Sequence, residues 1–257
     1  MKSRACLLVP EVVQTSNMDC GPAALKCLLG GFGINVHYGR LREACQTDVD
    51  GTSIDTIEEV ANQLGLQAEQ IMLPADHVLL EEAAALPAIA VVVLPNGITH
   101  FVVVWRRHGR WLEIMDPATG RRFTPADRFL DELYIHRMPV VAEDWREYAR
   151  SESFLSSLRQ RIHRLGTSDQ IERLFRRATK DPDWQSIAAL DAGVRMVESI
   201  ARSGALARGG QTARVLESFL DETETIPDHY WSVRPAPEEG QLLLRGAVLV
   251  RALGKWP

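Results

Sequence analysis

The chain has 257 residues, 46% of them hydrophobic and 25% charged, and its formal net charge is −5 at pH 7. This size and composition are those of an ordinary globular protein that buries its own core in one large domain or two modest ones. Between Glu43 and Trp105 there are ten acidic residues and no lysine or arginine. This part of the chain repels phosphate backbones, so we expect no nucleic acid partner.

Cysteine and glycine spacings in the sequence exclude several classes of site. The sequence contains no Cys-x-x-Cys pair, no paired-histidine motif, no phosphate-binding P-loop and no complete dinucleotide fingerprint. We therefore expect no metal, no cofactor and no ATP site, and the thiols favour a reducing, cytosolic setting. The four cysteines are Cys6, Cys20, Cys27 and Cys45.

Two apolar segments raise the question of export or membrane insertion. The apolar run within residues 1–10 is too short for a signal peptide and is followed by no cleavage-like site. The most apolar segment, over 83–105, is interrupted by Pro87, Pro95 and Gly97. It therefore predicts two buried strands and a turn, and we expect neither a secretion signal nor a membrane span.

The first third of the chain predicts an extended arm and three short helices. The arm covers 7–13 and leads into the first helix, which a run of glycines ends. Pro22 fits the first turn of that helix, and Gly65 stops the third. The predicted helices span 20–29, 36–44 and 54–64.

Strand signals then follow as far as the middle of the chain. Runs rich in β-branched and apolar residues alternate with Pro-Asn-Gly and His-Gly-Arg turns. The predicted strands span 66–73, 89–94, 99–107 and 111–115.

Beyond Val141 the spacing of apolar residues changes to that of amphipathic helices. Helices are predicted over 144–165, 168–179, 184–203 and 212–220, followed by a proline-rich connection over 223–239. Residues 241–253 form a last apolar stretch whose pattern fits either strand or helix. We therefore predict an α+β fold over 1–140, followed by a mostly helical accessory or linker region over 141–257.

One cysteine is placed where its chemistry would change. Cys20 comes directly before Gly21 and Pro22, at the start of the first predicted helix. The positive end of a helix favours the thiolate and lowers a cysteine pKa. Most lone cysteines are simply small buried apolar residues, so this position alone favours a nucleophile only weakly.

Three further residues complete a possible catalytic set. His100 stands at the start of an apolar, β-branched run, and Asp116 ends the next one. Gln14 lies six residues before Cys20, where its amide could reach the sulfur and act as an oxyanion donor. A nucleophile, a base and an orienting acid are thus all available in one chain.

The order of these motifs resembles a known family. Gln14, the run Asp19-Cys20-Gly21-Pro22-Ala23, the run His100-Phe101-Val102-Val103 and the run Asp116-Pro117-Ala118-Thr119-Gly120 are similar to those of bacteriocin-processing cysteine peptidases. Those are papain-like domains at the N-terminus of peptidase-containing ABC transporters. The resemblance covers roughly residues 7–140 and includes Gly51-Thr52-Ser53. It departs at Gly30-Gly31-Phe32-Gly33, where the family usually has aromatic residues before the last glycine.

The resemblance implies both a fold and a set of roles. It implies a helical half and an antiparallel sheet half with the active site in the cleft between them. Cys20 would be the nucleophile, His100 the general base and acid, and Asp116 the residue that orients the imidazole. Gln14 and the Cys20 backbone N–H would stabilise the oxyanion.

It also implies a substrate and partners. Family members remove leader peptides that end in a double-glycine motif, and the leader upstream forms an amphipathic helix that docks on an apolar surface. The helices over 36–44 and 54–64 are the candidates for that surface here, although their apolar faces are equally those of core helices. The implied partners are a precursor peptide and the membrane and ATPase domains of an exporter. The implied location is the cytoplasm, at the cytoplasmic face of the inner membrane if the chain is part of a transporter.

Two other functions fit parts of the same pattern. A catalytically silent docking domain would bind transporter substrates without cutting them, but the presence of all four candidate residues argues against it. Another papain-like amidase or peptidoglycan peptidase is disfavoured by the Asp116-Pro117 pair and by the expected lack of a signal peptide. The sequence is compatible both with a stand-alone protein and with part of a longer transporter.

Overall fold

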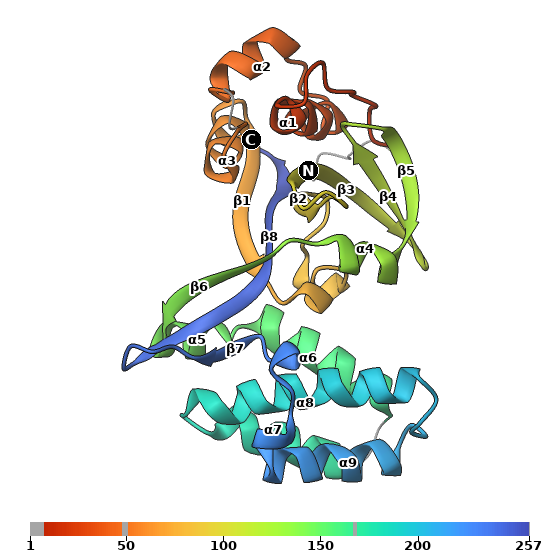
Figure 1. Cartoon of the computed structure of the whole chain (residues 1–257), viewed down its shortest axis with the longest axis vertical. Coiled ribbons are helices and arrows are strands. Elements are labelled where there is room, and N and C mark those ends of the chain that lie inside the picture. The colour runs from red at the N-terminus through yellow and green to blue at the C-terminus, as the bar shows by residue number, and fades with distance from the viewer. Residues whose placement is uncertain (1–7, 48–50, 167–168, 257) are drawn as a thin grey trace. The chain divides into compact units, whose positions relative to one another are not determined.

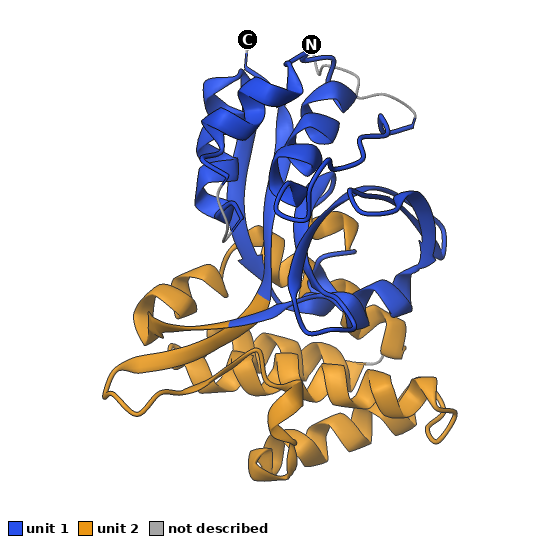
Figure 2. Ribbon diagram, turned by 45° about the horizontal axis from the view of Figure 1, so that its top comes forward, with its two compact units in different colours: residues 1–79, 85–136, 247–257 blue, residues 80–84, 137–246 orange. Residues whose placement is uncertain are grey.

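The computed structural model describes residues 8–47, 51–166 and 169–256, so Cys6 and the first residue of the predicted arm lie outside them. The chain divides into two compact units (Figure 2). The first unit comprises residues 1–79, 85–136 and 247–257, and the second comprises 80–84 and 137–246. Over the described ranges, none of the helices is both long and apolar enough to cross a membrane.

The three helices predicted for the first third of the chain are confirmed (Figure 1). Ser53 caps the third of them, because its side chain accepts a hydrogen bond from the Thr56 N–H at 3.1 Å. Gly65 follows that helix with a φ of +89°, a conformation that glycine adopts without strain. The helices are α1 (Cys20–Gly31), α2 (Tyr38–Ala44) and α3 (Ile54–Gln63).

An antiparallel sheet follows, in which the strand order is β1-β8-β2-β3-β4-β5. The four predicted strands are present with ends shifted by at most one residue, and β5, β6 and β7 were not predicted. The strands are β1 (Leu66–Leu73), β2 (Ala88–Val93), β3 (Thr99–His108), β4 (Trp111–Asp116), β5 (Gly120–Pro125), β6 (Ile135–Val141), β7 (Val233–Pro235) and β8 (Gln241–Lys255). Helices and antiparallel strands together confirm the α+β class.

Helices pack on the strands of the first unit. Helix α1 packs on β3 and α3 packs on β1, while a short helix α4 (Ala126–Glu132) packs on β4 and β5. The Trp105 ring lies directly against Gly31, where a Cβ atom would overlap it, and Phe32 meets the same ring edge-on at 5.7 Å. The glycine-rich departure from the family pattern is therefore filled by a tryptophan from β3.

Most of the last strand belongs to the first unit: residues 247–255 of β8 lie in it, and residues 241–246 lie in the second unit. Residues 247–255 of β8 pair with β1 over Leu66–Leu73, and Ala88–Ala90 of β2 pair with its other edge. Leu249 and Val250 are fully buried in this central position. The structure therefore differs from the expected division at residue 140, because residues 247–255 pair with strands of the first unit that lie far away in the sequence, and the apolar pattern of 241–253 does not reveal that pairing.

The second unit is mostly helical, as expected. The helix predicted over 144–165 is two helices, because Ser151 starts a new one by accepting a hydrogen bond from the Phe154 N–H. The helices are α5 (Ala142–Tyr148), α6 (Glu152–Leu165), α7 (Asp169–Lys180), α8 (Trp184–Arg202) and α9 (Gly210–Asp221). Four short 3-10 helices also occur in the described chain, at Ala75–His77, Glu81–Ala83, Thr223–Thr225 and Asp228–Tyr230.

A buried ion cluster ties the second unit together. The Asp191 carboxylate on α8 is fully buried and accepts hydrogen bonds from Arg161 at 2.7 Å, Arg195 at 2.9 Å and Ser232 at 2.7 Å. Arg195 also donates to the Tyr230 carbonyl. Since a buried carboxylate is tolerated only when it is paired, this cluster fixes the segment before β7 against α8.

The position of β8 predicts how the chain tolerates deletion. A fragment that ends at residue 140 should not fold, because it loses a central strand. Each buried Leu or Val that is lost with that strand removes roughly 1.5–3 kcal/mol of burial free energy, against a total stability of about 5–15 kcal/mol. A variant in which a short Gly-Ser linker replaces residues 142–240 should fold, since the Ala142 N–H donates to the Gly240 carbonyl at 3.0 Å and the two ends adjoin.

Cooperative thermal unfolding and near-ultraviolet circular dichroism compare the two proteins. The linked variant is expected to show both signals and the 1–140 fragment neither. A cooperatively unfolding 1–140 fragment would show that β8 is dispensable.

Candidate active site

The structure brings three of the four predicted site residues together in the first unit. Cys20 and His100 share a side-chain hydrogen bond. His100 Nε2 lies 2.9 Å from Asp116 Oδ1. Because Nε2 bonds Asp116, the ring nitrogen that bonds the Cys20 sulfur is the other one, Nδ1.

Strand register places the histidine beside the aspartate. Val103 on β3 pairs with Met115 on β4, so Asp116 lies opposite Val102. His100 is two residues from Val102 and therefore on the same face of the sheet, as a diagonal neighbour of Asp116. Both side chains are buried, His100 at 5% exposure and Asp116 at 7%.

The turn after Asp116 fixes its carboxylate. Asp116 Oδ1 accepts a second hydrogen bond from the Ala118 N–H at 2.9 Å, and the Asp116 carbonyl accepts from the Thr119 N–H at 3.2 Å. This is the local turn chemistry of an aspartate followed by proline. One carboxylate oxygen is therefore held in place for the imidazole.

Cys20 lies at the N-terminal end of helix α1. Cys20 is its first residue and is partly exposed. Backbone N–H groups of Gly21 and Phe101 hydrogen-bond the sulfur. At Gly21 a Cβ atom would lie only 2.9 Å from the Thr52 Cβ, so the glycine after Cys20 makes room for the threonine of the predicted Gly-Thr-Ser motif.

The three side chains shift each other's pKa values toward an ion pair. Burial raises the pKa of the Cys20 thiol, but the bonds from His100 and the backbone outweigh it, and the pKa is lowered below its usual range. Burial lowers the pKa of His100, and the bonds to Asp116 and Cys20 raise it to about 9. Burial raises the pKa of Asp116, and His100 lowers it below its usual range. The arrangement therefore favours thiolate, imidazolium and carboxylate together.

The loop before Cys20 is anchored by a buried carboxylate. Asp19 is fully buried and accepts hydrogen bonds from Thr15 Oγ1 at 2.7 Å and Arg42 Nε at 2.8 Å. Its side chain does not cap α1. These bonds connect the segment that leads to Cys20 with helix α2 and so restrain the backbone directly before that cysteine.

Gln14 lies close to the site through its backbone. Its N–H donates to the Pro117 carbonyl at 2.9 Å, one residue beyond Asp116. Its side-chain Oε1 is buried without a hydrogen-bond partner among the described residues. The structure thus places Gln14 next to the Asp116 turn, and its role as an oxyanion donor stays a prediction.

Sequence reasoning missed the residues that anchor the arm. Glu113 is fully buried and accepts a hydrogen bond from the Val9 N–H at 3.0 Å, and Arg121 donates to the Val9 carbonyl. Both lie on the face of β4 and β5 that carries Met115. The sequence did carry a signal for Glu113, which is a charged residue in the middle of an otherwise apolar strand. Such a residue is buried only when it has a partner, so its position predicts one.

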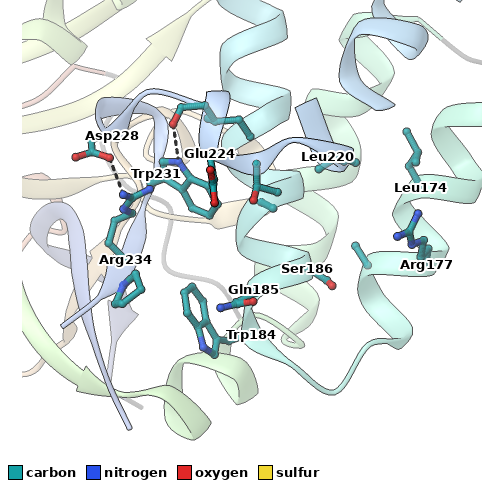
Figure 3. A pocket seen from close by; sticks show the side chains of 15 residues that line it. Leu174, Arg177, Trp184, Gln185, Ser186, Leu220, Glu224, Asp228, Trp231 and Arg234 are labelled. Atoms are coloured by element: carbon teal, nitrogen blue, oxygen red, sulfur yellow. Dashed lines mark hydrogen bonds and ion pairs between the residues drawn. The ribbon is translucent and has the colours of Figure 1, made fainter. Parts of the chain in front are cut away.

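A separate cavity lies within the second unit (Figure 3). Its volume is about 640 Å³, and two indoles, Trp184 and Trp231, contribute to its wall. Arg234 lies over the Trp231 ring at 5.2 Å and pairs with Asp228 at 2.8 Å. Its lining residues include neither cysteine nor histidine in the described part of the chain, so this cavity does not hold the thiol chemistry.

The pKa shifts predict the reactivity of the thiols. In a Cys6→Ser background, iodoacetamide should alkylate Cys20 rapidly at pH values below the ordinary thiol pKa of about 8.5. Cys27 and Cys45 should stay unlabelled in the folded protein, because both are buried and burial raises their pKa values, that of Cys45 to about 11.

Peptide mapping by mass spectrometry measures which thiol reacts at each pH. His100→Ala should move the alkylation of Cys20 to higher pH, since it removes the hydrogen bond that favours the thiolate. Equal pH dependence in the parent and His100→Ala would contradict the ion pair.

Comparison with known proteins places these residues in a family. Residues 9–135 match the Peptidase C39 family. The lactococcin-G-processing and transport ATP-binding protein LagD of Lactococcus lactis is 34% identical over 110 residues, which are 43% of this chain and 16% of that protein. An uncharacterized protein of Methanothermobacter thermautotrophicus is 31% identical over 111 residues, 43% of this chain and 72% of that protein.

A solved double glycine motif protease from an AMS/PCAT transporter, in complex with the leader peptide, has 24% identity and a TM-score of 0.42, covering 51% of this chain and 87% of that one. The chain spans about one sixth of the length of transporter relatives such as LagD. The match of this chain to the Peptidase C39 family, over residues 9–135, includes all four candidate residues. The chain therefore belongs to the Peptidase C39 family.

Proposed function

We propose that the protein is a cysteine endopeptidase that removes double-glycine-type leaders from ribosomally made peptide precursors. The observation that carries the proposal is the continuous hydrogen-bonded series from Cys20 through His100 to Asp116. The four candidate residues make a silent docking domain a poorer account of the same site. Membership of a cysteine peptidase family supports the reaction class.

The geometry suggests how the reaction would run. The Cys20 thiolate attacks the carbonyl carbon of the scissile peptide bond, and a tetrahedral oxyanion forms. His100, which is protonated below a pKa of about 9, gives its proton to the leaving amine, and a thioester remains. His100 then takes a proton from the attacking water, and the thioester is hydrolysed to the leader carboxylate and free Cys20. Asp116 holds the ring in the required orientation.

The oxyanion needs donors on the other side of the carbonyl. The Cys20 N–H is among the first of α1 and has no acceptor within the helix. Gln14 is the second proposed donor, supported by its position beside the Asp116 turn. Two fixed donors in a partly buried site stabilise the developing charge more than water does.

A second feature fits the upstream part of a leader. A groove of about 700 Å³, here called the α2 groove, adjoins α2 and the end of α3. Three of its lining residues belong to α2, and Leu64 follows α3, so the groove adjoins both helices that were the candidates for leader docking. An amphipathic helix would lay its apolar side there. The α2 groove is lined by Asn35, Val36, His37, Arg40, Leu41, Ala44 and Leu64.

The names of the relatives suggest the biological setting. LagD is named for processing and transport of lactococcin G, and a Streptococcus pneumoniae relative is a transport and processing ATP-binding protein. We propose that this protein acts on a peptide destined for an ABC exporter, at the cytoplasmic face of the membrane.

Cleavage of a synthetic double-glycine leader peptide, such as that of lactococcin G, tests the proposal. The parent should cut after Gly-Gly, and Cys20→Ala should not cut but should still bind the leader. Asp116→Asn should lose less activity than Cys20→Ala, because the base is misoriented and not removed. Changing Gly-Gly to Val-Val should lower kcat/KM by roughly thirtyfold or more, since overpacking costs about 1–3 kcal/mol at each of the two positions.

The same assay tests the α2 groove. Val36→Asp should raise KM and leave kcat nearly unchanged, with Val141→Asp, an exposed valine of the second unit, as a surface control. Because Val36 packs partly against the core, thermal unfolding must show that Val36→Asp still folds. Cleavage of the Val-Val peptide within a few-fold of the parent peptide would contradict the double-glycine specificity. Turnover by Cys20→Ala would contradict the nucleophile.

A further inference from the structure

Asp116 has a second charged neighbour besides His100. Its Oδ1 is occupied by the His100 ring and the Ala118 N–H. Its other oxygen, Oδ2, lies 3.5 Å from Nε of Arg122. The aspartate therefore stands between an imidazole and a guanidinium.

Strand pairing places Arg122 there. Asp116 pairs with Gly120 and Ile114 pairs with Arg122 across the β4–β5 hairpin. Side chains two residues apart on a strand share a face, so Arg122 lies on the face that carries Asp116. This is also the side on which α4 contacts β4 and β5, since Glu132 of α4 bonds the same guanidinium.

The far end of the guanidinium is held by other residues. Arg122 Nη2 donates to Glu132 Oε2 at 2.6 Å and Nη1 to Glu132 Oε1 at 3.2 Å, and Nη1 also donates to Thr124 Oγ1 at 2.8 Å. A planar guanidinium bound at two nitrogens cannot rotate freely. Its Nε is buried and forms no hydrogen bond among the described residues, so this edge is held facing Asp116 by charge alone.

We propose that Arg122 is a positioning residue of the site: fixed by Glu132, its guanidinium keeps Asp116 ionised and turned so that Oδ1 meets His100. This inference rests on the proposed peptidase function. Sequence reasoning did not identify Arg122, although its place six residues after Asp116 across a tight hairpin follows from the turn.

A comparison with a site that lacks Arg122 shows why a cation is needed beside Asp116. Without Arg122, the carboxylates of Asp116 and Glu132 would approach the same region with no positive charge between them, and like charges disfavour ionisation. The hydrogen bond from His100 lowers the pKa of Asp116 most, the Ala118 N–H and the charge of His100 follow, and the Arg122 charge adds a smaller effect in the same direction. A lysine would keep the charge, but it would not form the pair of hydrogen bonds that the two guanidinium nitrogens donate to Glu132.

The groups that face Asp116 define the expected pH effect. They are His100 from β3, Arg122 from β5 and the Ala118 N–H of the turn, with Cys20 and Glu132 one contact further away. Removing Arg122 raises the pKa of Asp116, so the carboxylate is lost at a higher pH than in the parent. The acid limb of activity should therefore move to higher pH.

Arg122→Met, Arg122→Lys and Arg251→Met test the inference in the full chain. Arg251 is the matched control, because on the same sheet it donates hydrogen bonds to Glu69 from two nitrogens. Its side chain is 22% exposed, and that of Arg122 is 29% exposed. Arg122→Met should lower kcat by about ten- to a hundredfold, as expected for a misplaced catalytic group. KM should change little, and Arg122→Lys should recover part of the loss. Arg251→Met should behave as the parent.

Two readouts separate this inference from the proposed function. Leader cleavage gives the pH profile of kcat/KM, and iodoacetamide alkylation of Cys20 reports the ion pair without any peptide substrate. If the parent does not cut the leader but Arg122→Met still moves the alkylation profile relative to Arg251→Met, the proposed function fails and the positioning role stands. Identical alkylation profiles for Arg122→Met and Arg251→Met would overturn it. Arg122→Lys carries the same comparison if Arg122→Met does not fold.

Discussion

The site depends on the hydrogen bond between Cys20 and His100. It joins the start of a helix to the start of a strand 80 residues away, and it makes a thiolate stable in a partly buried position. Every other feature of the site serves that contact. Asp116 and its turn hold the ring, the buried Asp19 restrains the chain before the sulfur, and Arg122 opposes the second oxygen of Asp116.

The contact between Cys20 and His100 also requires a particular strand register in the sheet. His100 and Asp116 meet only if β3 and β4 keep their register, and β3 in turn is held by β2. The other edge of β2 pairs with β8, which comes from the last residues of the chain. The residues of the second unit are thus inserted in the sequence between strands of one sheet, so the first unit is continuous in space and discontinuous in sequence. That organisation distinguishes this chain from a simple N-terminal peptidase followed by a linker.

Much of the fold could be predicted because its signals are local. The helix that starts at Cys20, the Ser53 cap and the first four strands depend on neighbouring residues, and the structure has them within a few residues. The identity of Cys20, His100, Asp116 and Gln14 came from motif order, and the structure brings the first three together. The place of β8 could not be predicted, because its apolar pattern fits either strand or helix and its partners β1 and β2 lie far away in the sequence. Glu113 and Arg122 were missed for a related reason: their partners, Val9 and Glu132, become neighbours only through strand pairing and helix packing.

The central claim is that the Cys20 sulfur attacks the carbonyl carbon of the second glycine of a Gly-Gly pair. A leader peptide that ends in a Gly-Gly chloromethyl ketone measures this directly, because it alkylates only a nucleophile that it reaches in the substrate position. After digestion, mass spectrometry should find the adduct on Cys20 of the parent, strongly reduced in His100→Ala and with a Val-Val analogue. An adduct confined to Cys27 or Cys45, or one on Cys20 that forms equally with the Val-Val analogue, would contradict the account.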